Sequence, residues 1–157
     1  MTKEDISSKN YRPCVGIMVR NSKGEILIAM RKDTQGAWQM PQGGIEPEET
    51  PETAAFRELA EETGISPDKV SLQKITSGWL AYDYPSDFSR KHTRNYLGQK
   101  QKWALLDFTG TDSDINLATE EPEFSVWRWA SPQEVVDLIV PFKKNVYVKA
   151  FSELGLL

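Results

Sequence analysis

The stretch GGIEPEETPETAAFRELAEETGI, residues 43–65, carries the signals that decide the fold. The hydroxyl of Thr50 can accept a hydrogen bond from the free amides of a first helical turn, and Pro51 suits the first helical position. Gly64 suits the left-handed conformation that follows a last helical turn. The sequence therefore predicts a helix from Pro51 to Thr63.

The predicted helix carries three glutamates on one face. Its apolar residues share one side, and the opposite face carries Glu58, Glu61 and Glu62. Like charges three and four residues apart repel by about 0.2–0.5 kcal/mol per pair, and the helix dipole disfavours anions in the last turn. Arg57 is the only basic residue between Glu46 and Glu62, so we expect no basic neighbours that neutralise the cluster. Two interpretations remain open, a solvated acidic face and a site for a hard divalent cation such as Mg²⁺.

Strand-like segments surround this helix along the chain. A hairpin is expected from Val15–Val19 and Glu25–Met30. The other expected elements are strands at Val70–Leu80, Lys102–Phe108 and Val126–Ala130, a helix that Ser131 caps and that leads to Val140, and a helix at Lys143–Leu154. Strands and helices do not alternate strictly, so the sequence predicts an α/β fold with a mixed sheet sandwiched between helices rather than a doubly wound sheet.

Length, charge and cysteine content exclude several classes of protein. The chain has 157 residues, and we expect residues 1–157 to form one domain with a flexible segment at 1–10. Its 19 basic and 23 acidic residues give a net charge of −4, so no global positive field attracts duplex DNA or an anionic membrane. We expect neither an export signal nor a membrane span, and Cys14 is the only cysteine. A cytoplasmic protein fits these features.

The opening stretch also carries a recognisable motif. A glycine is followed by a glutamate, then by Arg-Glu-apolar, Glu-Glu and Gly-apolar, at Gly43, Glu49, Arg57-Glu58-Leu59, Glu61-Glu62 and Gly64-Ile65. At these spacings the chain resembles the Nudix hydrolase family. The resemblance implies an α/β/α sandwich and Mg²⁺-dependent cleavage of a nucleoside diphosphate linked to another moiety, with Mn²⁺ or another divalent cation as a substitute.

Further blocks of sequence resemble one branch of that family. The blocks are Tyr11-Arg12-Pro13, Val15-Gly16-Ile17, Trp38 to Gly44, Gly98 to Trp103, Pro122-Glu123-Phe124, Trp127-Arg128-Trp129 and Phe142-Lys143. In them the chain is similar to bacterial RNA pyrophosphohydrolases and to hydrolases that cleave diadenosine tetraphosphate asymmetrically. Both activities share these motifs, so the blocks do not separate the two substrates.

The resemblance implies roles for the acidic residues. Glu58, Glu61 and Glu62 are expected to bind the metal, and Glu123 is expected to bind metal or to accept the proton of the attacking water. The choice between Glu58 and Glu123 as general base stays open, and so does a merely solvated Glu123. The resemblance thus implies a catalytic set of four glutamates.

Three more residues of the motif are expected to support this set. Gly43 would bring the backbone close to the metal or phosphate, because glycine has no side chain that prevents a close approach. Arg57 is expected to pair with Glu49 and so to orient the loop around the metal ligands.

Six residues are expected to bind the substrate. They are Arg12, Arg31, Tyr82, Gln99, Phe142 and Lys143. The cations suit phosphates through charge-assisted hydrogen bonds, and the aromatic rings suit stacking on bases. The alternatives are solvated surface cations and rings packed in the core.

A local basic patch lies between Phe88 and Leu106. This segment has no acidic residue and five basic ones, Arg90, Lys91, Arg94, Lys100 and Lys102. Such a patch suits the phosphates of an RNA strand, although a solvated basic loop has the same composition.

The leading hypothesis is an enzyme that removes pyrophosphate from 5′-triphosphorylated RNA, a 5′-end processing step that promotes mRNA decay. The alternatives are asymmetric cleavage of diadenosine tetraphosphate to ATP and AMP, hydrolysis of free nucleotides, and a non-catalytic module that binds nucleotides or RNA. Loss of a motif glutamate would signal the non-catalytic module, and none is lost. The sequence leaves the oligomeric state open, and a monomer is compatible with it.

Overall fold

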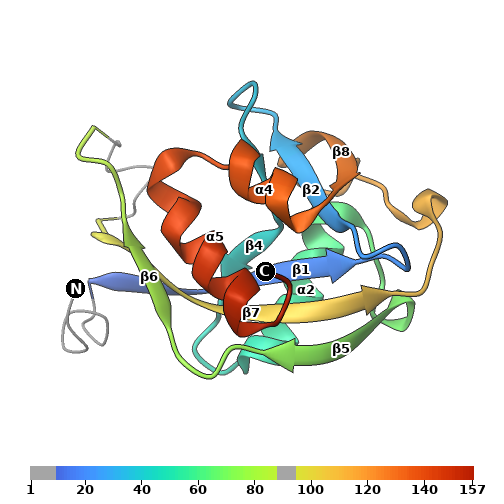
Figure 1. The fold of residues 1–157 in the computed structure, drawn as a ribbon, viewed down its shortest axis with the longest axis horizontal. Helices are drawn as coiled ribbons and strands as arrows, with labels where there is room; N and C mark the ends of the chain where they lie inside the picture. The colour runs from blue at the N-terminus through green and yellow to red at the C-terminus, as the bar shows by residue number, and fades with distance from the viewer. Residues whose placement is uncertain (1–9, 88–94) are drawn as a thin grey trace.

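The computed structural model describes residues 10–87 and 95–157 (Figure 1). These residues form the strands β1 (Tyr11–Arg20), β2 (Ile26–Arg31), β3 (Trp38–Gln39), β4 (Gln42–Gly44), β5 (Val70–Ile75), β6 (Leu80–Asp83), β7 (Gly98–Phe108) and β8 (Phe124–Ala130). The helices are α2 (Pro51–Thr63), α4 (Pro132–Leu138) and α5 (Pro141–Glu153), with 3₁₀ turns at Pro67–Lys69 and Asp112–Asp114.

The strands form one mixed sheet with the main order β3-β2-β1-β7-β5. β1 runs parallel to β7 along its whole length, from Tyr11 opposite Gly98 to Arg20 opposite Asp107. The other pairs are antiparallel: β2 pairs with β1, β3 and β8, β4 pairs with β1, and β5 and β6 pair with β7. The predicted mixed sheet is confirmed.

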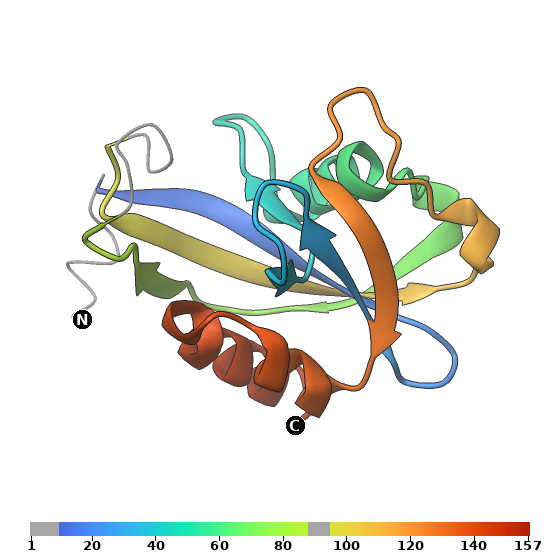
Figure 2. The same cartoon turned by 90° about the horizontal axis from the view of Figure 1, so that it is seen from above.

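Helices cover both faces of the sheet. Figure 2 shows α2 on one face and the pair α4 and α5 on the other, with the strands between them. Successive side chains of a strand point to opposite faces, so Ile17 of β1 packs in the core under α2 and Met18 packs in the core under α5. The predicted α/β sandwich is confirmed, and a buried core stands on each side of the sheet.

Helix α2 has the predicted bounds and caps. It runs from Pro51 to Thr63, and the Thr50 hydroxyl accepts a hydrogen bond from the Thr53 amide at 3.2 Å. Gly64 ends the helix in the left-handed region with φ of 72°, and its amide donates to the Ala60 carbonyl. Local sequence was sufficient here because every capping signal lies within two residues of the helix ends.

The segment expected as one strand at Val70–Leu80 is two strands. β5 ends at Ile75 and β6 begins at Leu80, and both pair with β7 at different places along it. The break follows from Thr76, whose hydroxyl accepts a hydrogen bond from the Trp103 amide at 2.9 Å. A side chain thus takes the place of a ladder carbonyl, and the chain turns through Ser77 and Gly78 before it pairs again.

The last two helices also differ from the predicted ranges. The helix expected to reach Val140 ends at Leu138, and the helix expected to begin at Lys143 begins at Pro141. Proline disfavours a helical conformation in the residue before it and suits a first helical position itself. Pro141 therefore ends one helix and begins the next.

The expected hairpin of β1 and β2 is confirmed only at its turn. The two strands pair at Arg20 and Ile26, and further along β1 its neighbour is β4 instead. The segment Gln42–Gly44, for which no strand was predicted, supplies that strand. β4 places Gly43 opposite Val15, and this arrangement brings the motif glycine over α2.

Two further expectations concern membrane spans and the N-terminal segment. No helix in the two described ranges is long and apolar enough to cross a membrane. The segment expected to be flexible, 1–10, lies outside the described residues except for Asn10.

We expect the substitution Gly64→Ala to destabilise the fold more than an alanine at another glycine of positive φ. A Cβ at Gly64 would lie 2.8 Å from the Asn116 carbonyl oxygen, in addition to the strain of φ at 72°. Each such conflict costs about 1–3 kcal/mol. Gly24→Ala is the matched control, because Gly24 has φ of 79° with nothing within 4 Å of its Cβ position. Urea unfolding compares the two variants, and equal free energies of unfolding would contradict the role of the Asn116 contact.

Candidate active site

The three glutamates of α2 lie at different depths. Glu62 is 2% exposed, whereas the side chains of Glu58 and Glu61 are 14% and 57% exposed. Glu62 is thus on the buried side of the helix together with Leu59, which the helical pattern alone did not predict. β4 causes this burial by lying across the helix, and the Gln42 amide donates to Glu62 Oε2 at 3.3 Å.

The backbone of β4 comes very close to Glu58. A Cβ at Gly43 would lie 2.0 Å from the Glu58 carboxyl carbon, so a side chain does not fit there. The Gly43 backbone therefore lies close to a carboxylate of the motif, and its expected approach to a metal or phosphate stays a prediction.

Arg57 connects the motif glutamates. Its guanidinium donates to both carboxylate oxygens of Glu49 at 2.7 Å and to the Gly44 carbonyl at 2.9 Å. It also donates to Glu58 at 2.9 Å and contacts Glu61 at 3.2 Å. These bonds lower the pKa of Glu49 to about 2. The expectation that no basic side chain neutralises the cluster is wrong, because one planar guanidinium reaches three carboxylates at once.

Arg57 does not reach the deepest carboxylate. The pKa of Glu62 is raised well above its usual value, first by burial and then by repulsion from Glu123 and Glu58. The pKa of Glu58 and that of Glu123 are also raised, in both cases chiefly by burial. Glu123 lies just before β8, and its carbonyl accepts a hydrogen bond from the Lys32 amide at 3.0 Å. Folding thus brings together negative charges from α2 and from a distant loop.

The chemistry of these residues fits a hard divalent cation. Among the described residues, the buried carboxylate of Glu62 accepts one long hydrogen bond, from the Gln42 amide. Carboxylate oxygens are the ligands that Mg²⁺ prefers. Within residues 10–87 and 95–157, no group of three or more acidic, histidine or cysteine side chains is placed so that it could hold a metal ion. Glu58 and Glu61 instead contact Arg57, so ion pairing and metal binding compete for the same oxygens.

A cleft of about 950 Å³ joins the acidic cluster to a cationic and aromatic wall. The lining includes the motif residues Gly43, Arg57, Glu58, Glu61 and Glu62, and also Glu123. The expected substrate residues in its lining are Arg12, Arg31, Tyr82, Gln99, Phe142 and Lys143. Glu49 lies behind the lining and contacts it through Arg57. The fold therefore collects residues from the whole chain around one space.

The cationic wall is partly neutralised and partly buried. Arg31 forms two hydrogen bonds with Asp33, at 2.9 and 2.7 Å, a partner that the sequence analysis did not predict. The Lys143 ammonium lies 5.8 Å and 5.7 Å from the ring centres of Tyr82 and Phe142, and burial lowers its pKa to about 8. Arg12 lies against Gly44, where a Cβ would be 2.5 Å from its guanidinium.

The two aromatic residues differ in exposure. Tyr82 is 6% exposed, and its ring packs against Tyr84 and Phe142 at centroid distances of 5.9 and 5.6 Å. Its hydroxyl is buried without a hydrogen-bond partner among the described residues. Phe142 is half-buried at the cleft. The Tyr82 ring is therefore packed in the core, which was the alternative to base stacking. The Phe142 ring has a surface that is accessible from the cleft.

The sequence analysis missed several polar residues of the cleft. Gln39, Gln42 and Tyr84 line it together with Asp33 and Trp38. Gln39 and Gln42 lie in one of the blocks that carried the resemblance, so the block was noticed but its amides were not assigned a role. Amide side chains carry no charge, and their position in a cleft depends on strand pairing that the sequence does not show.

The described part of the basic patch does not line the cleft. Lys100 and Lys102 alternate with Gln99 along β7 and so point to the opposite face of the sheet, where their ammonium groups lie 4.8 and 5.4 Å from the ring centre of Trp79. The other three basic residues, Arg90, Lys91 and Arg94, lie outside the described residues. The idea that this patch follows an RNA strand stays a prediction.

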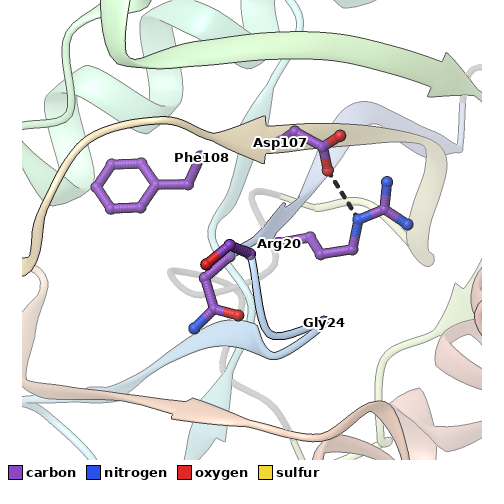
Figure 3. A pocket seen from close by; sticks show the side chains of 6 residues that line it. Arg20, Gly24, Asp107 and Phe108 are labelled. Atoms are coloured by element: carbon purple, nitrogen blue, oxygen red, sulfur yellow. Dashed lines mark hydrogen bonds and ion pairs between the residues drawn. The ribbon is translucent and has the colours of Figure 1, made fainter.

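A second, smaller hollow lies at the turn between β1 and β2. Figure 3 shows Arg20, Gly24, Asp107 and Phe108 around it, with Arg20 Nε and Asp107 Oδ1 paired at 2.7 Å. Because an aspartate of the same hollow neutralises the arginine, the hollow has none of the charge separation of the cleft.

The sequence profile of the NUDIX domain matches residues 10–150. The chain belongs to the Nudix family. Members of this family generally use divalent cations such as Mg²⁺. This Nudix chain is 52% identical to an RNA pyrophosphohydrolase of Roseobacter denitrificans over 150 residues, which are 94% of each chain. It is 48% identical to an RNA pyrophosphohydrolase of Rickettsia bellii over 149 residues, covering 92% of this chain and 91% of the relative.

Solved structures show the same Nudix fold at lower sequence identity. A C. elegans Ap4A hydrolase in a binary complex superposes with a TM-score of 0.68 and 19% identity, covering 92% of this chain and 97% of the other. The E. coli dihydroneopterin triphosphate pyrophosphohydrolase superposes with a TM-score of 0.68 and 18% identity, covering 92% and 98%. At these identities the likeness establishes the fold.

We expect Glu62→Gln to stabilise the Nudix fold at pH 7 in the absence of divalent cations. The folded state raises the pKa of the Glu62 carboxyl group and so favours its protonated form. The folded protein is therefore most stable below the unfolded pKa of about 4.5, and it loses this stability as the pH rises through the folded pKa. At pH 7 the variant should melt at a higher temperature than the wild type, by about 2–4 °C for each kcal/mol by which its free energy of unfolding is larger. At pH 4 the two proteins should melt at the same temperature. Thermal unfolding against pH measures this, with Glu48→Gln on the exposed loop as control. A wild type that melts as high as the variant at pH 7 would refute it.

Mg²⁺ should raise the melting temperature of the wild type. Binding at a hundredfold excess over the dissociation constant stabilises the folded state by about 2.7 kcal/mol. Glu62→Gln should lose most of this gain, and NaCl at matched ionic strength should reproduce little of it. Equal shifts with the two salts would mean that simple screening of the acidic cluster explains the effect.

Proposed function

We propose that this protein is an RNA pyrophosphohydrolase that removes pyrophosphate from the 5′-triphosphate end of RNA in the cytoplasm, a step that promotes mRNA decay. The observation that carries the proposal is one cleft with a carboxylate pole and a cationic pole, in a chain about half identical to RNA pyrophosphohydrolases over more than nine-tenths of its length. The two poles suit a cation and a polyphosphate side by side.

The acidic residues take the metal and the proton in this proposal. A bound divalent cation supplies Lewis acidity and a water of lowered pKa. Glu58, Glu61, Glu62 and Glu123 would hold this cation, and Gly43 leaves room for the close packing of backbone and carboxylate. The base is Glu58 or Glu123, which accepts the water proton while the water oxygen attacks phosphorus and the anhydride bond breaks. Their raised pKa values make both better proton acceptors than an exposed glutamate.

Arg57 and Glu49 support the site without contacting substrate. The bidentate bond between them, together with the bond to the Gly44 carbonyl, fixes β4 and the loop that follows it relative to α2. This fixes the spacing between Gly43 and Glu58, on which the metal site depends.

The cationic wall holds the phosphates and the first bases of RNA in this proposal. Arg12, Arg31 and Lys143 provide charge-assisted hydrogen bonds, and Lys143 remains mostly protonated at pH 7 because its pKa is about 8. The accessible ring of Phe142 offers a stacking surface, Gln99 offers an amide, and buried Tyr82 supports the Phe142 ring from behind.

The second candidate is asymmetric cleavage of diadenosine tetraphosphate to ATP and AMP. The same two-pole cleft suits it, because the reacting phosphate chain is again bound between carboxylates and cations. The difference between the substrates is the RNA strand that continues beyond the first nucleotides. A non-catalytic binding module is less well supported, since each motif glutamate is present and Glu58, Glu61 and Glu62 line the cleft.

Parallel measurements of kcat/KM on triphosphorylated RNA, diadenosine tetraphosphate and free nucleoside triphosphates test the proposed function. We expect RNA to give the highest value, and Glu62→Gln to lower turnover on every substrate by at least about a hundredfold, the scale of losing a catalytic group. Glu48→Gln, with the same change of charge on the exposed loop, should retain wild-type turnover. Higher kcat/KM on diadenosine tetraphosphate would favour the second candidate, and no hydrolysis of any substrate would favour the binding module.

A further inference from the structure

A chain of buried hydrogen bonds runs behind the wall of the cleft. The Trp103 indole donates to Gln101 Oε1 at 3.1 Å. Gln101 Nε2 donates to Gln42 Oε1 at 2.8 Å and to Gln99 Oε1 at 2.9 Å. Gln99 Nε2 then donates to the Tyr84 hydroxyl at 2.9 Å. Trp103 and Gln101 are 0% and 1% exposed, so the chain begins in the core and ends at the cleft.

The direction of this chain is fixed by its buried end. An indole nitrogen carries a hydrogen and cannot accept, so the amide of Gln101 must turn its oxygen toward Trp103. Its NH₂ group then faces Gln42 and Gln99, which must both turn their oxygens inward. The reverse orientation would place NH₂ against N–H at Trp103, which leaves a buried donor without a partner.

The indole itself has little freedom to turn. A Cβ at Gly16 would lie 2.4 Å from the Trp103 ring, so the ring lies flat against the glycine backbone. The ring of Tyr147 also packs against it, at a centroid distance of 5.2 Å and an angle of 76° between the ring planes. The core therefore holds the direction of the indole N–H constant.

The consequence appears at the surface of the cleft. With the oxygen of Gln42 turned inward, its NH₂ group has no hydrogen-bond partner among the described residues and is open to the cleft. Gln99 likewise presents its NH₂ end toward Tyr84 in the cleft lining. This part of the wall therefore offers donors, and a phosphate chain at neutral pH is almost purely an acceptor of hydrogen bonds.

We propose that Trp103, acting through Gln101, sets the polarity of the cleft wall so that Gln42 and Gln99 present hydrogen-bond donors to the phosphate chain of the substrate. Trp103 and Gln101 are positioning residues in this proposal, because neither lines the cleft. This inference rests on the proposed function only because that function identifies the bound anion as the phosphate chain of the substrate. Without the indole, the three amides could rotate together and present oxygens that repel phosphate.

Titration with inorganic tripolyphosphate, in buffer free of divalent cations, tests the inference without reference to catalysis. The substitution Gln101→Met removes the NH₂ group that orients the amides of Gln42 and Gln99. The substitution Trp103→Phe removes the indole N–H that fixes the orientation of Gln101. We expect the dissociation constant to rise by about tenfold in Gln101→Met, which corresponds to about 1.4 kcal/mol, and by at least about threefold in Trp103→Phe. In the wild type, the side-chain amide signals of Gln42 should shift on titration in an ¹⁵N NMR spectrum.

Leu105→Ala is the matched control for damage to the core. Leu105 is buried in the same cluster as Trp103 and belongs to the same strand, so its truncation lowers stability but leaves the amide chain intact. We expect it to bind tripolyphosphate as the wild type does. Thermal unfolding shows whether each variant folds, and Gln101→Met tests the same point with Trp103 in place if Trp103→Phe does not fold.

Three results would overturn the inference. They are wild-type affinity in Gln101→Met, equal affinities in Trp103→Phe and Leu105→Ala, and failure of the wild type to bind tripolyphosphate. A wild type that binds tripolyphosphate in the expected way, yet does not hydrolyse triphosphorylated RNA, would overturn the proposed function and leave this inference standing.

Discussion

The carboxylate of Glu62 is held out of water beside two other carboxylates, and the rest of the site is arranged around this unfavourable charge. Burial disfavours the ionised form, and Glu58 and Glu123 add repulsion. Arg57 relieves Glu49, Glu58 and Glu61 but does not reach Glu62. The fold thus retains a buried carboxyl group whose ionised form is disfavoured, and a bound divalent cation would favour that form.

The sheet makes this arrangement possible because it brings segments that are distant in sequence to one side of α2. β1 holds β7 on one side and β4 on the other, so the strand with Gly43 and the strand with Gln99 are both anchored to the same ten residues. Pro13 accepts from the Ile45 amide at 3.0 Å and extends this anchor into the loop that leads to α2. The acidic pole and the donor-rich wall are therefore positioned by one strand.

Charge and hydrogen-bond polarity have separate origins in this cleft. Charged groups such as Arg31, Lys143 and Glu123 act over several ångströms, and their effects are moderated by partners such as Asp33. The amide wall is neutral, and its direction depends on one indole in the core. In the proposed function, the cationic wall and the neutral donors both bind the polyphosphate, whereas the carboxylates of the opposite pole bind the divalent cation.

The sequence by itself determined α2 with its caps, the mixed character of the sheet, the family, and part of the lining of the cleft. Those signals are short-range, or they lie in the motif and in the blocks that resemble one branch of the family. It did not determine that Glu62 is buried while Glu61 is exposed, since that depends on β4 crossing the helix. The split of the segment at Val70–Leu80 depends on the hydroxyl of Thr76 bonding across to Trp103. The amide chain that joins Gln101 to Gln42 was decided by the tertiary structure alone, because hydrogen-bond partners 59 residues apart leave no periodic pattern along the chain.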